Sequence, residues 1–336
     1  MTHQKIAQLV GVSPSTVSKA LSGSKEVSEE LREKIIKVAV ESNYFKEKTK
    51  RRLDYVKENA TAVAIICPEI ISIHYSGIVT SIKNRIEAYG GQAAIYVFDF
   101  DDDKQNKIIE NIVLRGAVDG IITFSSIKLA TIPNIPIVCL CDHRINSFYS
   151  TIYCDYGQVF LDAVNHLKSL GHTRIGFVGE SLTRSKNEAF RYAMTKNGLL
   201  IDESVIYKIP KRFEDVGYDA AEKMLKSNNI PSAVITAYDE IALGMIHTFT
   251  ANGLRVPEDI SVIGLNDIPY AAYSQVPLTT VRTFSDELYR LAVELLYDKI
   301  LDKDHVIKHI ITNHELVVRQ STGPYLPKES EMRSKK

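Results

Sequence analysis

The amino-acid sequence predicts an α/β fold: a small three-helix domain at the N-terminus, then two lobes that each contain a parallel, doubly wound sheet. Three observations support this prediction. Three segments before residue 45 have the apolar spacing and capping residues of helices. From residue 62 onward, short apolar runs alternate with helical segments in two consecutive series. A chain of 336 residues also exceeds the size of one compact core.

The first 22 residues predict two helices joined by a tight turn. The first covers Gln4–Val10, and the turn follows at Gly11. Ser13 suits the N-cap of the second helix and Pro14 its first position, so this helix should begin abruptly and run to about Ser22. The inner face of the first helix would be formed by Ile6, Ala7 and Val10. Two helices around a short turn that contains glycine are the helix-turn-helix pattern.

A third helix should follow, with Ser28 as its N-cap and Glu29 and Glu30 in its positive first turn. The residues spaced to complete a three-helix core are Leu31, Ile35 and Val38.

The second helix presents two different faces. Val17 and Leu21 form an apolar stripe that can be buried, whereas Pro14, Ser15, Ser18 and Lys19 are short or basic and lie on another face. Residues 1–60 carry 12 Lys and Arg against 8 Asp and Glu, although the whole chain has a net charge of zero. A basic module on a slightly acidic body is the distribution expected of a DNA-binding head.

Residues 46–59 form a basic segment that cannot bury much surface. We expect it to be poorly ordered when free and to order near phosphates, since phosphates relieve the repulsion between its charges. A solvated linker without a role of its own is the alternative. The apolar Leu53 inside this basic segment favours a function.

The body should consist of two lobes with helices on both faces of each parallel sheet. The expected elements of the first lobe are strands 62–67, 93–98, 120–124 and 137–141 and helices 75–89 and 104–114. Those of the second are helices 159–170, 185–197, 216–226 and 240–252 and strands 175–178, 205–209, 233–236 and 260–265. Gly171, Gly198 and Gly253 directly follow helices, where a positive φ is favourable.

The last part of the chain predicts a helix at 286–301 and a β-rich end at 306–318 that returns to the first lobe. The expected domains are thus 1–45, the linker 46–59 and the body 60–323, with residues 324–336 as a disordered tail. Within the body, the N-lobe would comprise 60–157 and 286–323, and the C-lobe 158–285. The tail has no leucine heptads that would predict a coiled-coil tetramer.

Ligands of open parallel sheets bind beyond the carboxyl ends of the strands, so we expect the ligand in the cleft between the lobes. The strand-end candidates are residues 68–75, 124–126, 142–144 and 179–186, Tyr238-Asp239 and Leu265-Asn266-Asp267. No P-loop or GxGxxG motif is present, so neither a nucleotide nor any other cofactor is expected.

Metal binding and enzymatic activity are not favoured by the remaining motifs. The acidic run Asp99–Asp103 lacks the glycine and the closing glutamate of a calcium loop, so a solvated strand-to-helix loop is expected. His305, His309 and His314 have no zinc-site spacing. The four cysteines (Cys67, Cys139, Cys141 and Cys154) show no CxxC, which predicts reduced, buried thiols. With no signal peptide and no apolar run near ~20 residues, a cytoplasmic location is expected.

Motifs across the chain resemble the lactose/galactose repressor family of bacterial transcription regulators. In the N-terminal part they are Ile6-Ala7, Gly11-Val12-Ser13, Thr16-Val17-Ser18-Lys19-Ala20-Leu21, Asn43-Tyr44 and Leu53. In the body they are Leu170-Gly171-His172, Ile175-Gly176-Phe177-Val178, Ala242-Leu243-Gly244, Val256–Gly264 and Pro277-Leu278-Thr279-Thr280-Val281. Asn266-Asp267-Ile268-Pro269 looks most like the branch that regulates β-galactosidase and galactose operons.

The resemblance implies a homodimer that places the helix beginning at Pro14 in the major groove of each operator half-site. On that helix we expect Ser15 and Lys19 to contact bases, because lysine can donate to guanine O6 and N7. Ser13, Thr16 and Ser18 are expected to donate to phosphates. In the hinge, Leu53 matches the family's leucine that wedges into the minor groove. Lys46 and Lys50 replace a usual proline and a usual small residue, which predicts strong salt dependence of binding.

The resemblance also implies an effector site with an acidic or amide residue, which here is Asn266. Asn266 offers both a donor and an acceptor to neighbouring sugar hydroxyls, and Asp267 is the next candidate, with a structural role as its alternative. Lys186 stands where the family has a ligand arginine, but a lysine cannot make the bidentate contact of arginine. The other candidates are Tyr75, Phe213 and Tyr238 for stacking, or else ordinary packing. Ser125 is a further candidate at a strand end, and Asp155 is one at the start of the stretch that crosses between the lobes.

The function that follows is a ligand-responsive bacterial repressor, not an enzyme, that binds a palindromic operator as a dimer and is released by a galactoside-type sugar. Its partners would be operator DNA, a small sugar and a second copy of the chain, with no membrane. A corepressor-dependent regulator of the same fold is the alternative. A sugar-binding transport protein is a further alternative, which the N-terminal domain and the lack of a signal peptide disfavour.

The hinge leucine yields a test. Replacing Leu53→Ala should abolish specific operator affinity but retain weak, nonspecific binding, because only the kinked complex uses the wedge. A gel-shift titration with operator and scrambled duplexes measures both affinities. Unchanged operator affinity would contradict the wedge role.

Overall fold

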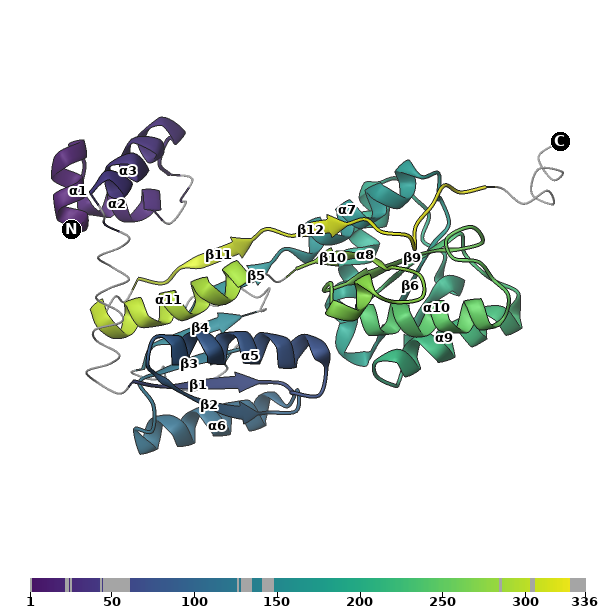
Figure 1. Cartoon of the computed structure of the whole chain (residues 1–336), viewed down its shortest axis with the longest axis horizontal. Coiled ribbons are helices and arrows are strands. Elements are labelled where there is room, and N and C mark those ends of the chain that lie inside the picture. The colour runs from purple at the N-terminus through teal and green to yellow at the C-terminus, as the bar shows by residue number, and fades with distance from the viewer. Residues whose placement is uncertain are drawn as a thin grey trace. The chain divides into compact units, whose positions relative to one another are not determined.

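A computed structural model describes residues 2–21, 24, 26–42, 44, 61–125, 127, 135–140, 148–283, 286–302 and 306–326. The predictions for the hinge with Lys46, Lys50 and Leu53, for Ser126, for residues 142–144, for Cys141 and His305, and for the tail from 327 therefore fall outside the described residues. The α/β fold class is confirmed: two six-stranded sheets follow an N-terminal group of three helices (Figure 1).

The N-terminal helices are α1 (His3–Val10), α2 (Pro14–Leu21) and α3 (Glu29–Glu41). Gly11 has φ of 80°, and its N–H donates to the carbonyl of Ala7 (2.8 Å), which ends α1 and forms the predicted turn. Ser28 caps α3 by accepting from the N–H of Leu31. The core of this headpiece (residues 2–44) contains the predicted Ile6, Ala7, Val10, Val17 and Ile35, with Leu21, Leu31 and Val38 packed against it.

The chain forms two compact units. The first contains residues 1–70, 78–152 and 289–310, and the second contains residues 71–77, 153–288 and 311–336.

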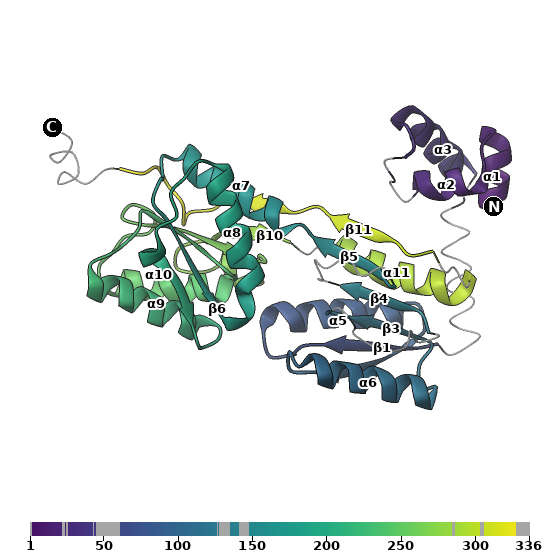
Figure 2. The same cartoon turned by 180° about the vertical axis from the view of Figure 1, so that it is seen from behind.

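The sheet of the first unit has the order β11-β5-β4-β3-β1-β2, with the parallel pairs β1·β2, β1·β3, β3·β4 and β4·β5. The strands are β1 (Ala62–Cys67), β2 (Gln92–Val97), β3 (Gly120–Thr123), β4 (Ile137–Leu140), β5 (Ser150–Cys154) and β11 (His309–Thr312). The helix α6 (Asp102–Arg115) covers one face; α5 (Ile73–Ala88) and α11 (Asp286–Asp302) cover the other (Figures 1 and 2).

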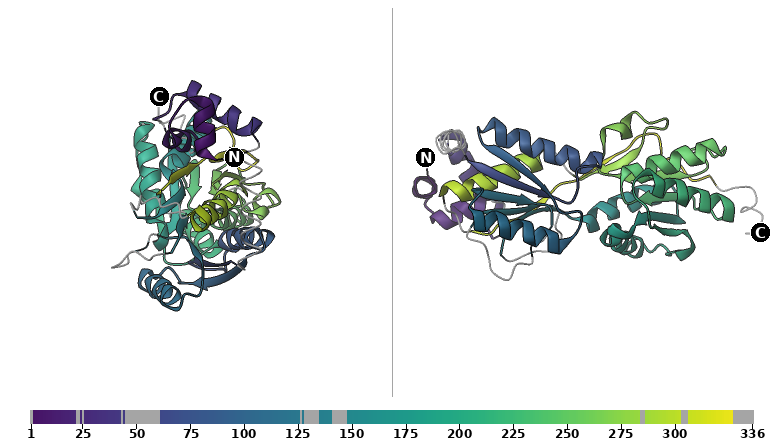
Figure 3. Two further views of the ribbon diagram at one scale, coloured as in Figure 1. Left: turned by 90° about the vertical axis from the view of Figure 1, so that its left-hand side faces the viewer. Right: turned by 90° about the horizontal axis from the view of Figure 1, so that it is seen from below.

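The sheet of the second unit has the order β12-β10-β9-β8-β6-β7. Its strands are β6 (Ile175–Glu180), β7 (Ile206–Ile209), β8 (Ala233–Thr236), β9 (Ser261–Leu265), β10 (Thr279–Arg282) and β12 (Glu315–Val317). The helices α7 (Tyr156–Ser169) and α8 (Arg184–Lys196) cover one face, and α9 (Glu214–Ser227) and α10 (Asp239–Ala251) the other, as further views in Figure 3 also show. Gly171, Gly198 and Gly253 have positive φ after their helices, as predicted.

Two strands and one boundary differ from the predictions. β5 and β10 begin with the polar residues Ser150-Thr151 and Thr279-Thr280, which are buried in the sheets and therefore gave no apolar signal. The β-rich end does not return to the first lobe as a whole. β11 lies at the edge of the first sheet, whereas β12 pairs antiparallel with β10 in the second, with Val281 opposite Leu316.

The acidic run and the histidines have structural partners. Asp101 caps α6 by accepting from the N–H groups of Asp103 (2.9 Å) and Lys104 (3.0 Å), so the run forms the expected strand-to-helix loop. His309 contacts Thr151 and His314 contacts Asp162.

Cys67, Cys139 and Cys154 are buried, free thiols. No helix among the described residues is long and apolar enough to cross a membrane.

The packing of α9 against α10 in the second unit depends on two glycines. A Cβ on Gly217 of α9 would lie 2.1 Å from the carbonyl oxygen of Ile241, and a Cβ on Gly244 of α10 would lie 2.3 Å from that of Glu214. Both neighbours are backbone atoms that cannot rotate away.

We therefore expect Gly217→Ala or Gly244→Ala to destabilise the protein by roughly 1–3 kcal/mol through overpacking, measured by urea denaturation. Gly77→Ala in α5 is the matched control, because no atom outside the neighbouring helix backbone lies within 4 Å of its added Cβ. The control should be stabilised by roughly 0.4–1 kcal/mol through the lower entropy of its unfolded chain. Equal stabilities for the three variants would contradict close packing of α9 on α10.

Candidate DNA-binding and effector sites

The helix α2 is built as predicted, with a buried back and an accessible front. Val17 and Ala20 are buried in the headpiece core, whereas Ser15 and Lys19 are exposed one helical turn apart. Ser13 caps the helix, because its Oγ accepts from the N–H of Thr16 (3.1 Å). Pro14 is exposed at the first position and Ser18 is half-buried at the side of the helix.

The hydroxyl groups at the start of α2 contact one another. Ser13 Oγ lies 2.8 Å from both Ser15 Oγ and Thr16 Oγ1. The structure thus groups three of the predicted DNA-contacting side chains at one helix end, where partial positive charge favours a phosphate. Lys19 forms an ion pair with Glu26, a residue that the sequence analysis did not single out.

In the second unit, the predicted effector residues follow the ends of three adjacent strands. The sheet order places β9, β8 and β6 side by side, and they are parallel. Tyr238 comes shortly after β8 and Asn266 directly after β9. Glu180 ends β6 and was missed as an individual candidate, although it lies in the strand-end stretch 179–186. These residues share the carboxyl edge where α/β proteins bind ligands.

Tyr238 and Phe213 form an aromatic pair at this edge. Their ring centroids are 6.4 Å apart in an edge-to-face arrangement, and the N–H of Phe213 donates to the Tyr238 hydroxyl (3.0 Å). Phe213 has φ of 58°, a conformation that non-glycine residues rarely adopt. Burial raises the pKa of Tyr238, and the nearby Glu180 carboxylate adds to this, so the phenol stays protonated and can donate.

Arg212 contacts both Phe213 and Glu180. Its guanidinium lies 4.6 Å from the centroid of the Phe213 ring, and its Nε donates to the buried Glu180 carboxylate (3.3 Å). The cation therefore offsets the buried charge of Glu180 and holds the Phe213 ring.

Lys186 extends toward the same edge from α8. Its Nζ donates to the carbonyl of Ala237 (2.8 Å) and lies 5.3 Å from the ring centroid of Tyr156 and 5.8 Å from that of Tyr238. An ammonium between two aromatic faces is held in place by cation–π attraction. Tyr156 was missed because it follows β5, the strand that lacked an apolar signal.

Asn266 is 8% exposed and has φ of 104°. Its Oδ1 accepts from the hydroxyl of Thr283 (3.2 Å), while its Nδ2 makes no hydrogen bond within the described ranges. The side chain is thus oriented by one contact, and its amide group can donate to a ligand oxygen.

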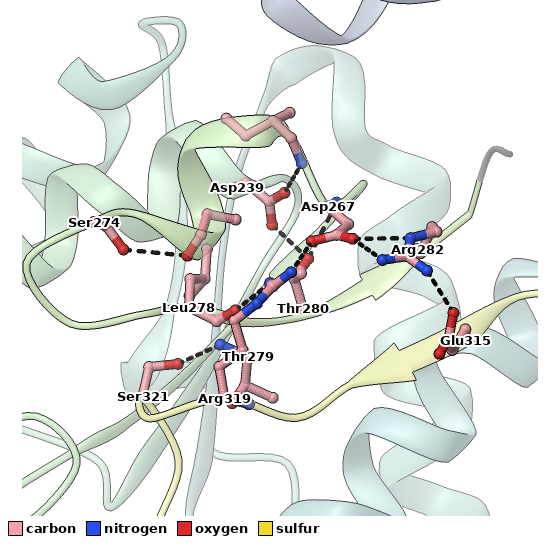
Figure 4. Close-up of polar contacts among 12 residues, drawn as sticks. Asp239, Asp267, Ser274, Leu278, Thr279, Thr280, Arg282, Glu315, Arg319 and Ser321 are labelled. Carbon is pink, nitrogen blue, oxygen red and sulfur yellow. Dashed lines mark hydrogen bonds and ion pairs between the residues drawn. The ribbon is translucent and has the colours of Figure 1, made fainter. Parts of the chain in front are cut away.

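Asp267 is clamped by two arginines, as Figure 4 shows. Arg282 donates from Nε (2.9 Å) and NH2 (2.6 Å) to Oδ2, and Arg319 donates from NH2 to Oδ1 (2.7 Å). Arg282 also contacts Glu315 of β12 (2.6 Å). Both carboxylate oxygens of Asp267 are therefore occupied, which favours the structural alternative for this residue.

Asp239 holds the loop after β9, which contains Asn266 and Asp267. It is completely buried and accepts from the Thr280 hydroxyl (2.5 Å) and from the N–H of Ile268 (2.8 Å). A Cβ on Gly264 would lie 2.1 Å from Asp239 Oδ1, so only glycine allows this approach. Burial raises the pKa of Asp239 to about 8.

The remaining predicted residues make local hydrogen bonds. Asp155 caps α7 by accepting from the N–H groups of Gly157 (2.9 Å) and Gln158 (3.3 Å). Tyr75 lies in residues 71–77 of the second unit, and its N–H donates to Ser72 Oγ (3.2 Å). Ser125 belongs to the first unit, where its carbonyl accepts from Gln105 (3.2 Å). Arg282 and Arg319 were missed as site residues because their partner Asp267 is distant in sequence, whereas Asp239 was among the strand-end candidates.

Two family profiles match the chain. "Bacterial regulatory proteins, lacI family" matches residues 2–47, and "Periplasmic binding protein-like domain" matches residues 164–322. HTH-type transcriptional regulator DegA of Bacillus subtilis is 31% identical over 96% of this chain and 98% of its own. Catabolite control protein A of Priestia megaterium is 28% identical over 96% and 99%, and the repressor PurR of Haemophilus influenzae 26% identical over 97% and 99%.

Solved structures show the same fold. A LacI family regulator from Lactobacillus casei with bound sucrose has a TM-score of 0.69 at 23% identity, covering 78% of this chain and 99% of its own. The transcriptional regulator CelR in complex with cellobiose has a TM-score of 0.67 at 23% identity, covering 96% and 99%.

The headpiece and the binding-protein-like body together define a ligand-responsive, DNA-binding transcriptional regulator. The chain belongs to the lacI family of bacterial regulatory proteins. The resemblance noted in the sequence is thereby confirmed, whereas the link to galactose operons stays a prediction.

The raised pKa of Asp239 predicts a pH-dependent stability. Between about pH 4 and 8 the folded state holds a proton on Asp239 that the unfolded chain has lost, so this residue's contribution decreases as pH rises. In Asp239→Asn, an amide oxygen can still accept from Ile268 while the amide group donates to Thr280. Urea denaturation should therefore show Asp239→Asn gaining stability relative to the unsubstituted protein from pH 5 to pH 8. A pH-independent difference between the two proteins would show that Asp239 is charged in the folded state.

Proposed function

We propose that this protein is a repressor that binds a palindromic operator as a homodimer and leaves it when a sugar binds beside Asn266. The single observation that carries the sugar assignment is the orientation of Asn266, whose oxygen is held by Thr283 while its amide group is available to donate. Sugar sites in proteins combine such fixed polar groups with aromatic surfaces. Tyr238, Phe213 and Tyr156 supply those surfaces at the same sheet edge.

The relatives support both parts of this proposal. PurR of Haemophilus influenzae is named a transcriptional repressor, and the two regulators of the same fold described above hold sucrose and cellobiose. Lys186 donates one hydrogen bond to Ala237 and can donate others to a sugar hydroxyl. We retain a galactoside as the expected inducer, with Tyr75, Ser125 and Asp155 as further contacts and Asp267 as the residue that positions Asn266.

For the DNA, we propose that α2 enters the major groove. Ser15 and Lys19 contact bases from its exposed face, and Ser13, Thr16 and Ser18 donate to phosphates beside Pro14. Lys50 and Leu53 of the hinge complete this surface at the operator centre. Binding is a regulatory equilibrium without a chemical step, and it takes place in the cytoplasm.

An apolar groove on the second unit supports the homodimer. It is lined by Leu243 and Ile246 of α10 and by Tyr270 and Tyr273, which are 62% and 87% exposed. Large exposed aromatic side chains around a groove are typical of protein–protein contacts. We propose a second copy of this chain as the partner, in a two-fold arrangement that matches a palindromic operator.

The proposal is tested by operator release. An operator selected from random duplexes by the full-length protein is titrated by fluorescence anisotropy with and without galactose, lactose, an α-galactoside, sucrose, glucose or cellobiose. We expect one galactoside to weaken operator binding at least tenfold. Asn266→Ala should leave sugar-free operator affinity unchanged but raise the sugar concentration needed for release about tenfold, which corresponds to ~1.4 kcal/mol.

Asn252→Ala is the matched control, because the Asn252 amide donates to the Thr248 carbonyl (2.8 Å) at the far end of α10. Its response to sugar should be unchanged. Tighter operator binding with sugar would identify a corepressor instead of an inducer. No response to any of the sugars would contradict the sugar assignment and leave the DNA-binding function standing.

A further inference from the structure

Glu26 places a negative charge beside the residue that we expect to read DNA bases. It lies in the turn after α2, and its Oε2 forms an ion pair with Lys19 Nζ. Both side chains are accessible, at 50% exposure for Lys19 and 68% for Glu26. The N–H of Glu26 donates to Ser24 Oγ (3.3 Å), which fixes the turn locally.

Neither stability nor general DNA affinity explains this carboxylate. An exposed ion pair contributes only about 0–1 kcal/mol to folding. A negative charge next to a DNA-binding helix opposes the attraction between basic residues and phosphates, on which general affinity depends. Glu26 also neutralises Lys19, so it weakens any contact of this lysine with a phosphate. The discrimination of bases is a role that an acidic residue can have at this place, because a carboxylate accepts from a base donor and repels a base acceptor.

The chemistry of the ion pair matches one base pair. In the major groove, guanine presents the acceptors N7 and O6, and the paired cytosine presents the donor N4–H next to them. Lysine is a donor that suits O6 and N7, and a carboxylate is an acceptor that suits N4–H. Because Lys19 and Glu26 are in direct contact, they offer a neighbouring donor and acceptor, which complement the neighbouring acceptor and donor of a G·C pair.

We propose that Glu26 determines operator specificity, by reading one G·C base pair per half-site together with Lys19. This inference rests on the proposed base contact of Lys19. Lys19 donates to guanine, and Glu26 accepts from the amino group of the paired cytosine. In the reversed pair, Glu26 faces guanine O6, an acceptor, and repels it. Glu26 is repelled in the same way by any other base that presents an acceptor at this position. The carboxylate therefore disfavours wrong DNA sites as well as favouring the right one.

The test uses the full-length protein and duplexes selected by it from a random pool. We expect a fixed G·C pair in each half-site. Anisotropy titrations then compare this operator with duplexes changed at that pair, for the unsubstituted protein, Glu26→Ala, Lys19→Ala and the double variant. In Glu26→Ala, the ratio of the affinity for the operator to that for duplexes changed at this pair should fall about tenfold. The ratios for changes at other pairs should stay the same. The double variant should lose little more than Lys19→Ala, since the two residues act together.

Glu30→Ala is the matched control, because it removes the same charge from an exposed position in the first turn of α3. It should change the affinity for all duplexes by one common factor and leave the discrimination intact.

The outcomes separate the two proposals. If Glu26→Ala behaves like Glu30→Ala while Lys19→Ala loses discrimination at one pair, this inference is wrong and the base contact of Lys19 stands. If Lys19→Ala loses discrimination nowhere, the base contact and the inference fail together. If the unsubstituted protein selects no sequence at all, the proposed operator binding itself is contradicted. Circular dichroism of each variant confirms that the headpiece is folded.

Discussion

The clamp on Asp267 is the interaction on which the effector side of the second unit depends. Three chain segments meet at one carboxylate: the end of β9, Arg282 at the end of β10, and Arg319 shortly after β12. A carboxylate that is 6% exposed is costly unless charged partners satisfy it, and these two arginines do so. The clamp holds Asn266 and Asp267 at φ values of 104° and 54°, which fixes the direction of the Asn266 side chain.

The same clamp links the loop that contains Asn266 to the C-terminal part of the chain. Arg282 bridges from Asp267 to Glu315 on β12, so the loop after β9 and this antiparallel edge strand form one polar network. Hydrogen-bonded polar networks of this kind make the segments that they join more rigid. A sugar bound beside Asn266, as we propose, would therefore contact a loop that is joined to β12 by ion pairs. Coupling between the effector and the operator must be reciprocal in free energy.

The sequence determined the parts of this protein that depend on local spacing. The helix-turn-helix followed from the cap at Ser13, the turn at Gly11 and the apolar positions of α1 and α2, all within one short segment. The alternation of strands and helices followed from apolar periodicity, because buried parallel strands read as apolar runs. Lys186, Tyr238 and Asn266 were predicted as effector residues because they follow predicted strands or match family motifs. The structure places them at the same sheet edge of the second unit.

Only the tertiary structure decided which side chains of different segments contact one another. Asp267 is paired with Arg282 and Arg319, and Lys19 with Glu26, in contacts that no local pattern contains. β5 and β10 are rich in threonine and serine, and they form strands because the neighbouring strands satisfy their backbone. The split of the chain's β-rich end between two sheets likewise depends on partners far away in sequence. Periodicity encodes which face of an element is buried, whereas the identity of the contacting residues is set when the elements pack.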